Sequence, residues 1–134
     1  MFKRFFSRNP APLSGAAATP RLKTYAADSG YVYHYFHQGD RPSPATDDAG
    51  MEFVFQISHN RQDWRPLTVS LPDAALLRWQ ADHAREISST ERYALVKMAL
   101  FQAFDQCPAP AVLRDSVRVE EAGVAGLLEK LGVD

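Results

Sequence analysis

The side chains best suited to binding a metal ion or to acid–base catalysis are four histidines and one cysteine. His34 and His37 lie in a segment dense in aromatic and β-branched residues, a composition typical of a β-strand. Since side chains alternate between the two faces of a strand, these two histidines should point to opposite faces. His59 is expected at the far end of the following strand, away from His37. We therefore expect no metal site and no cofactor, because the histidines share no face and Cys107 is remote in sequence.

A second set of polar residues lies where two helices are expected to meet. His83, Glu86 and Glu91 could act as acid–base groups there. Ser88 and Glu91, however, have the spacing of a capping box, in which each side chain accepts a hydrogen bond from the other residue's backbone N–H. No Gly-x-Ser-x-Gly sequence surrounds Ser88, and no Gly-rich phosphate-binding loop is present. The sequence thus favours a non-enzymatic protein, with catalysis by one of the histidines kept as a lesser hypothesis.

Cys107 and Lys97 stand out by residue type. Cys107 is the only cysteine, so no intrachain disulfide can form, which suits a reducing compartment. No apolar run approaches the roughly 20 residues that span a bilayer, and we expect a cytoplasmic protein. Lys97 interrupts an otherwise apolar helical segment, and its stem should lie along the core with the ammonium reaching water. The alternative is a cation that faces a pocket or a partner's carboxylate.

Strands are predicted from alternating apolar and polar residues and from β-branched and aromatic content. The expected strands span residues 31–37, 51–59 and 67–71, with a possible short edge strand at 117–119. A polar loop and a turn rich in polar residues connect the first three. Sequential strands joined in this way imply an antiparallel meander.

Helices are predicted over residues 73–86, from the Ser88 cap to Phe104, and over residues 120–131. The middle helix is apolar nearly all round from residue 93 onward, so it should be central, with Phe101 among its buried anchors. The sequence therefore predicts an α+β fold. In this fold a three- or four-stranded antiparallel sheet is packed on one face by two to three helices.

Charge is unevenly distributed along the chain. Residues 1–24 carry five basic side chains and no acidic one, whereas the rest carries 10 basic and 16 acidic side chains. Residues 9–20 are rich in Pro, Ala and Gly, which cannot bury enough surface to offset chain entropy. We expect a flexible basic N-terminal arm over residues 1–21 and a single domain over residues 22–134. A membrane-surface foot, a secretory signal and an organelle transit peptide are lesser alternatives for the arm.

The first predicted strand is rich in apolar side chains on both faces. One face carries three tyrosines and His37, and the other carries Val32, His34 and Phe36. Only one face can join the core that the next strand predicts. Tyrosine suits a partly hydrated surface because its ring is apolar and its hydroxyl is polar. We therefore favour an arrangement with the tyrosines on the outer face. The reversed arrangement leaves Val32 and Phe36 outside.

An apolar face left in water points to a covering segment or to a partner. We expect a non-enzymatic interaction module that forms a homodimer, or meets an unidentified protein partner, through this face. The alternative is a small-molecule or single-stranded nucleic-acid binding domain that uses the same face, because exposed aromatic rings stack on bases. The acidic body argues against nucleic acid, and we expect no membrane contact by the arm. The candidate binding residues are Tyr31, Tyr33, Tyr35, His37, Arg41 and Arg61.

Overall fold

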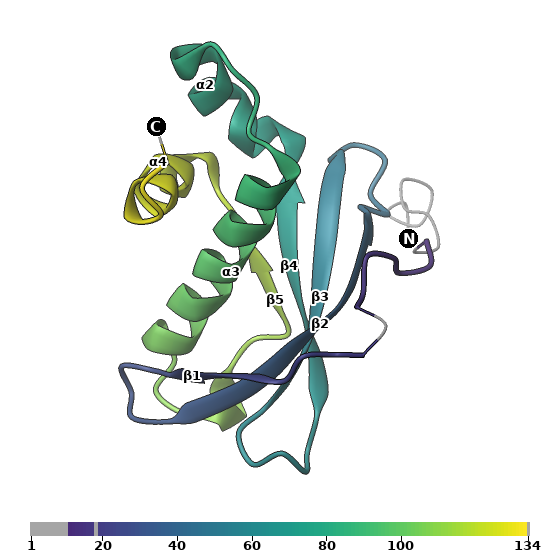
Figure 1. Ribbon diagram of the computed structural model, residues 1–134, viewed down its shortest axis with the longest axis vertical. Coiled ribbons are helices and arrows are strands. Elements are labelled where there is room, and N and C mark those ends of the chain that lie inside the picture. Colours follow the sequence, from purple (N-terminus) through teal and green to yellow (C-terminus); the bar gives the residue numbers. More distant parts are fainter. Residues whose placement is uncertain (1–10, 18, 134) are drawn as a thin grey trace.

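The computed structural model describes residues 11–17 and 19–133 and has an α+β fold (Figure 1). The strands are β1 (Lys23–Ala26), β2 (Val32–Pro42), β3 (Gly50–Ser58), β4 (Arg65–Pro72) and β5 (Ser116–Arg118). The helices are α2 (Asp73–His83), α3 (Ser89–Gln106) and α4 (Glu121–Lys130), with a 3-10 turn at Pro110–Val112. The predicted fold class is confirmed.

The sheet has five strands in the order β1-β2-β3-β4-β5, rather than the three or four that were expected. Strands β2 to β4 form the predicted antiparallel meander, and β1, which was not predicted, pairs antiparallel with β2. Strand β5 runs parallel to β4, so the prediction of a purely antiparallel sheet is wrong. The reason is the connection: α2 and α3 lie between β4 and β5 and return the chain to the starting end of β4.

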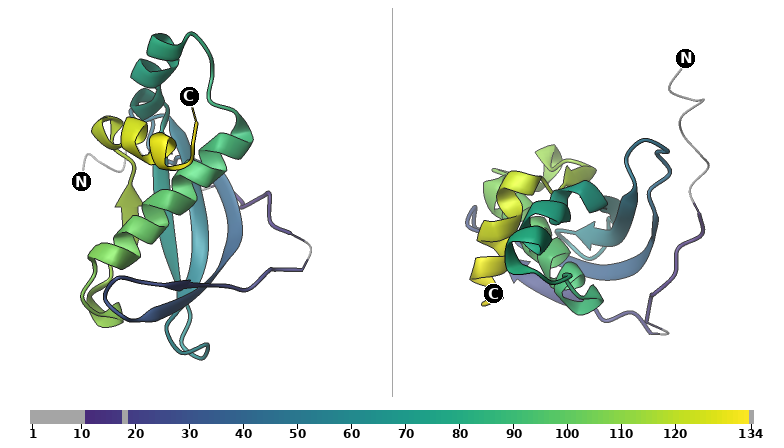
Figure 2. Two further views of the ribbon diagram at one scale, coloured as in Figure 1. Left: turned by 60° about the vertical axis from the view of Figure 1, so that its left-hand side comes forward. Right: turned by 90° about the horizontal axis from the view of Figure 1, so that it is seen from above.

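The described helices lie on one side of the sheet, which we call its inner face (Figure 2). The capping box predicted for Ser88 and Glu91 is confirmed, and α3 begins directly after it. Helix α2 begins after Pro72 as expected but ends at His83, before the predicted end near Glu86. Ala84 has a φ of 52°, the left-handed conformation that ends a helix.

The tyrosines of β2 point inward, so the prediction that they face outward is wrong. Tyr33 and Tyr35 are 1% and 4% exposed and lie in the core beneath α3. The ring of Tyr33 stacks on Phe104, with centroids 4.2 Å apart and planes at 3°. Tyr33 and Tyr35 share a face because side chains alternate along a strand, and the same alternation leaves Val32 and Phe36 on the outer face. Stacking on a buried aromatic ring offsets part of the cost of burying Tyr33, whose hydroxyl has no hydrogen-bond partner among the described residues.

Part of the predicted N-terminal arm pairs with the sheet. Ser14 and Asp40 exchange two backbone hydrogen bonds, of 2.9 and 2.7 Å, at the far end of β2. Leu13 lies against Gly39, where a β-carbon would come within 2.8 Å of the Leu13 Cβ. Gly39 follows a shift in register after His37, so the close approach requires glycine. Residues 1–10 lie outside the described residues, and the flexibility of the arm stays a prediction.

The central helix provides the first test of this packing. Phe104 is fully buried, whereas Phe101, expected as a buried anchor, is only partly buried and stacks on Tyr25 near the margin of the sheet. We expect Phe104→Ala to lower the free energy of unfolding by about 3–5 kcal/mol, and Phe101→Ala to lower it less. Urea denaturation followed by circular dichroism measures both values.

The control is Leu77→Ala, because Leu77 on α2 is 60% exposed. This change should cost about 0.5 kcal/mol or less. Equal midpoints for Phe104→Ala and Leu77→Ala would show that α3 is not held as described.

Candidate functional site

One end of the outer face of the sheet carries aromatic and uncharged side chains. Phe36 of β2 lies opposite Gln56 of β3, which in turn lies opposite Pro66 of β4. The ring of Trp64 lies 5.5 Å from that of Phe36. Val32, at the start of β2, is 45% exposed. We define the outer aromatic patch as Val32, His34, Phe36, Trp64 and Pro66.

The opposite end of the outer face is charged but internally paired. Arg41 of β2 lies across from Glu52 of β3, and its Nε donates to a Glu52 carboxylate oxygen at 3.0 Å. Arg118 of β5 pairs with Asp48 and lies 3.7 Å from Glu120. Because each cation has a carboxylate partner, this end of the face offers little free charge.

The described part of the arm covers the middle of the outer face. Val54 lies on the outer side of β3 and outside the core cluster, yet it is only 4% exposed. Its partner across the sheet is Gly39, the residue on which Leu13 lies. We attribute the burial of Val54 to this segment. The arm thus shields the boundary between the charged end and the outer aromatic patch.

The six candidate binding residues do not form one site. Tyr33 and Tyr35 are in the core, and burial raises the pKa of Tyr33 to about 12, which keeps its phenol neutral. Tyr31 is exposed in the turn between β1 and β2. Arg41 is occupied by Glu52. Of the six, Arg61 lies beside the outer aromatic patch, with its Nε 3.4 Å from Nδ1 of His34.

Sequence reasoning did not single out Trp64. This residue follows the turn after β3 and precedes Arg65, the first residue of β4. No local sequence pattern indicates a surface role for Trp64, because its ring contacts Phe36 of β2, a strand that is not adjacent to β4 in the sheet. A strand pairing that placed Phe36 on the outer face would have been needed to find it.

His37 points to the inner face, between aromatic rings. Its ring centroid lies 5.1 Å from that of Tyr93 and 5.6 Å from that of Phe55. Its Nε2 is buried without a hydrogen-bond partner among the described residues, and the nearest carboxylate oxygen, of Asp40, is 3.8 Å away. Burial lowers the pKa of His37, although Asp40 opposes this shift.

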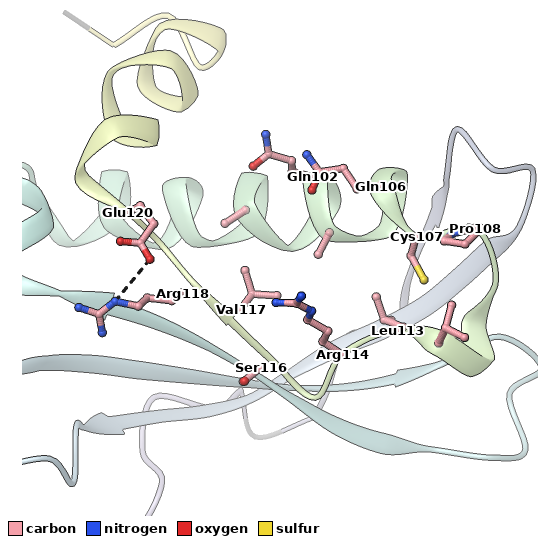
Figure 3. Close-up of a pocket in the computed structure, with 13 residues that line it drawn as sticks. Gln102, Gln106, Cys107, Pro108, Leu113, Arg114, Ser116, Val117, Arg118 and Glu120 are labelled. Carbon is pink, nitrogen blue, oxygen red and sulfur yellow. Dashed lines mark ion pairs between the residues drawn. The ribbon is translucent and has the colours of Figure 1, made fainter.

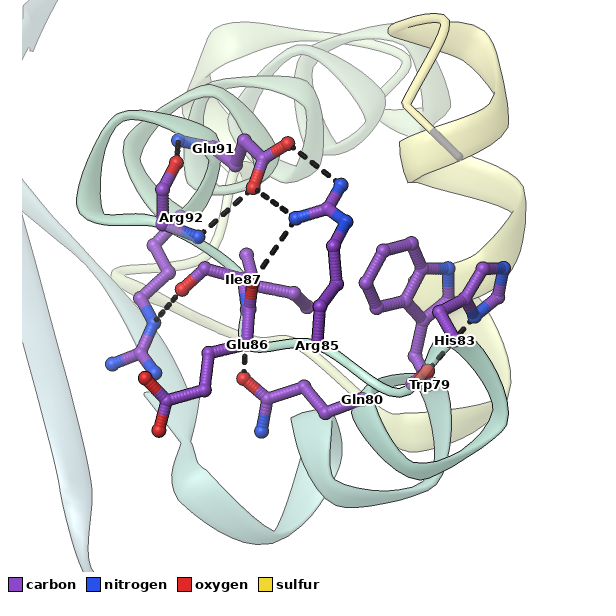
Figure 4. Close-up of polar contacts among 9 residues, drawn as sticks. Trp79, Gln80, His83, Arg85, Glu86, Ile87, Glu91 and Arg92 are labelled. Atoms are coloured by element: carbon purple, nitrogen blue, oxygen red, sulfur yellow. Dashed lines mark hydrogen bonds and ion pairs between the residues drawn. The ribbon is translucent and has the colours of Figure 1, made fainter.

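The polar residues between α2 and α3 hold the junction of the two helices (Figure 4). Arg85 donates two hydrogen bonds to the Glu91 carboxylate, at 2.9 and 3.0 Å, and the Ser88 N–H donates a third. The Arg85 bonds and the Ser88 N–H lower the pKa of Glu91 to about 2. The His83 ring stacks on Trp79 with centroids 3.9 Å apart. A carboxylate held ionised in this way is a poor proton donor near neutral pH.

Lys97 of α3 lies over aromatic rings rather than beside a carboxylate. Its ammonium is 5.8 Å from the ring centroids of Tyr35 and Phe101 and 5.9 Å from that of Tyr93. Burial, and secondarily the neighbouring Lys23, lower the pKa of Lys97. The side chain therefore follows the expected course along the core, with its charge stabilised by ring faces.

No group of three or more histidine, cysteine, aspartate or glutamate side chains within residues 11–17 and 19–133 could hold a metal ion. Over the same residues, no helix has the length and apolar character needed to cross a membrane. Comparison with known proteins gives no match: no family model, no curated protein and no solved structure resembles the chain. Any inference about the function therefore rests on the fold and on the surfaces that it presents.

The environment of His37 predicts a pH dependence of stability. Its pKa is lower in the folded state than the ordinary value of about 6.5, so the unfolded state binds more protons as the pH falls through that value. Stability should therefore decrease from about pH 7 to about pH 5. Urea denaturation at a series of pH values measures this slope.

The slope should flatten in His37→Phe and persist in His59→Gln, since His59 is exposed. Equal slopes in the wild type and His37→Phe would show that His37 is not responsible.

Proposed function

We propose that this protein is a non-enzymatic interaction domain that forms a homodimer through the outer aromatic patch. The observation that carries the proposal is the Phe36–Trp64 ring contact on a sheet face that no described helix covers. Within residues 11–17 and 19–133 the arm reaches only the middle of that face; Val32 and Pro66 of the patch are exposed, and Phe36 and Trp64 are half-buried. Removing such side chains from water is favourable by about 25 cal/mol per Å² of apolar area.

Exposed apolar residues concentrate beside this patch. Three of the five large hydrophobic side chains exposed in the described chain are Leu22, Tyr31 and Val32. These three flank or belong to the β1–β2 hairpin. Exposed apolar side chains therefore gather on the β1–β2 side of the sheet, where Val32 of the patch lies. Such a concentration is typical of a region near an interaction surface.

A second copy of the chain is the partner that suits this surface. In a two-fold symmetric dimer the same surface meets itself, so a patch with one sign of charge would repel its copy. The outer aromatic patch contains no permanently charged side chain, and Arg61 lies at its border. Two such faces can pack about 10 Å apart with interdigitating side chains, as in a sandwich of two sheets.

Phe36→Glu and Trp64→Glu test the homodimer. We expect the wild type to be dimeric, and each variant to be a folded monomer, because an unpaired carboxylate would be buried at the interface. Light scattering after size-exclusion chromatography, over a concentration series, measures the mass. Circular dichroism checks that the variants remain folded.

Leu77→Glu is the matched control, since it also replaces an exposed apolar residue but lies on α2, on the inner side. This variant should remain dimeric. A wild type that stays monomeric throughout the series would overturn the homodimer. If that monomer bound a single-stranded oligonucleotide and Phe36→Glu abolished the binding, the nucleic-acid alternative would replace it.

A further inference from the structure

A second surface lies on the inner side of the sheet, where β5 forms an edge. Strand β5 pairs with β4 on one side, and no other strand of the described chain pairs with its second side. The Thr68 N–H donates to the Asp115 oxygen at 2.9 Å, and the Val119 N–H donates to the Ser70 oxygen at 2.9 Å. Backbone groups of successive residues in a strand point to opposite sides. Ser116 and Arg118 therefore direct their N–H and C=O groups to the open edge.

A groove of about 540 Å³ lies between this edge and α3 (Figure 3). Its floor includes Ala99 and Ala103 of α3, whose small side chains leave the space open, together with Val117 of β5. Its wall at the 3-10 turn includes Val112, one of the large hydrophobic side chains that the described chain exposes. The groove thus joins an apolar floor to a row of free backbone groups.

Arg114 gives this groove a free positive charge. Its side chain lines the groove and is exposed, and no carboxylate of the described chain forms an ion pair with it. The other guanidinium in the groove, of Arg118, is held by Asp48 and Glu120. Asp115, the neighbour of Arg114, is paired with Arg65 at 2.6 Å. A ligand that brings a carboxylate would therefore meet an unoccupied cation.

We propose that the groove binds an extended peptide that adds to the edge of β5 and carries an Asp or Glu side chain that pairs with Arg114. The edge supplies hydrogen bonds at strand spacing, which a peptide backbone matches and a compact small molecule does not. Alternate peptide side chains would enter the space above Ala99 and Ala103. This site is separate from the outer aromatic patch, because it lies on the opposite side of the sheet.

A second copy of the chain suits this groove less well than an acidic peptide. If two β5 edges paired antiparallel about Val117, Arg114 of one copy would meet Glu120 of the other. Glu120 already lies 3.7 Å from Arg118 of its own chain, so the new pair would compete with an existing one. A carboxylate supplied by a peptide would not compete with an existing ion pair of the chain.

An array of synthetic heptapeptides, prepared in matched pairs that differ by Glu or Gln at one position, tests the proposal. We expect the wild-type protein to bind peptides with the Glu member favoured. Arg114→Ala should weaken binding of the best Glu peptide by about tenfold, as measured by fluorescence anisotropy, and should leave its Gln partner nearly unchanged. N-methylation of every second peptide nitrogen removes the N–H groups on one side of the extended peptide. It should abolish binding when that side faces β5 and should leave binding intact when the other side is methylated.

Ala103→Phe and Arg78→Ala complete the experiment. Ala103→Phe fills the groove and should abolish binding, whereas Arg78→Ala removes an exposed arginine on α2 and should have no effect. The proposal is overturned if no peptide binds saturably, or if binding survives both Arg114→Ala and Ala103→Phe. It is also overturned if Arg114→Ala alters the mass of the purified protein instead of peptide affinity, since that result would assign the edge to a second copy.

Discussion

The structure depends on the contact between Phe104 of α3 and Tyr33 of β2. Both side chains are almost completely buried, and their rings stack 4.2 Å apart. Once Tyr33 lies beneath the helix, strand alternation requires Tyr35 and His37 to face inward as well. The same geometry requires Val32 and Phe36 to face outward. One aromatic contact therefore decides both the composition of the core and the chemical character of the exposed sheet face.

Local sequence patterns were sufficient to predict most helices and strands. They were not sufficient to predict which face of a strand is buried. The alternation of β3 and β4, the Ser88 capping box and the apolar α3 were all correctly predicted, because each depends on residues close in sequence. Strand β1 was missed, since its four residues are held from a distance: Tyr25 donates a hydrogen bond to Asp105 at 2.7 Å. The inward face of β2 was missed for the same reason, as its burial depends on a helix some seventy residues further along. The patch around Trp64 required both the strand pairing and the correct face, so no local pattern could have found it.

Ion pairing divides the outer face into two ends of different character. At the charged end, Arg41 and Arg118 are each neutralised by carboxylates of the same chain. Paired charges on a surface remain hydrated and contribute little to binding. At the other end, aromatic rings lie beside uncharged polar groups, so burial there costs little in lost hydration. The uncharged character of the outer aromatic patch thus follows from where the chain places its charges as much as from where it places its rings.

The two edges of the sheet differ in the segments that lie beside them, and this difference bears on both proposed surfaces. At one side, β1 and the Ser14–Asp40 pair lie along the outer edge of β2, whereas at the other side the edge of β5 borders the groove, and no other described strand pairs with it. The short length of β5 and the arginines beside it are features that protect an edge from indiscriminate pairing. Arg114, whose charge is not paired within the described chain, would select an acidic strand over a basic one. A dimer formed through the outer face would leave both grooves facing away from the interface, so one assembly would present two peptide sites. Two sites held in a fixed relation bind a bivalent partner more tightly than either site alone, so the proposed dimer would strengthen the proposed peptide recognition on the opposite side of the sheet.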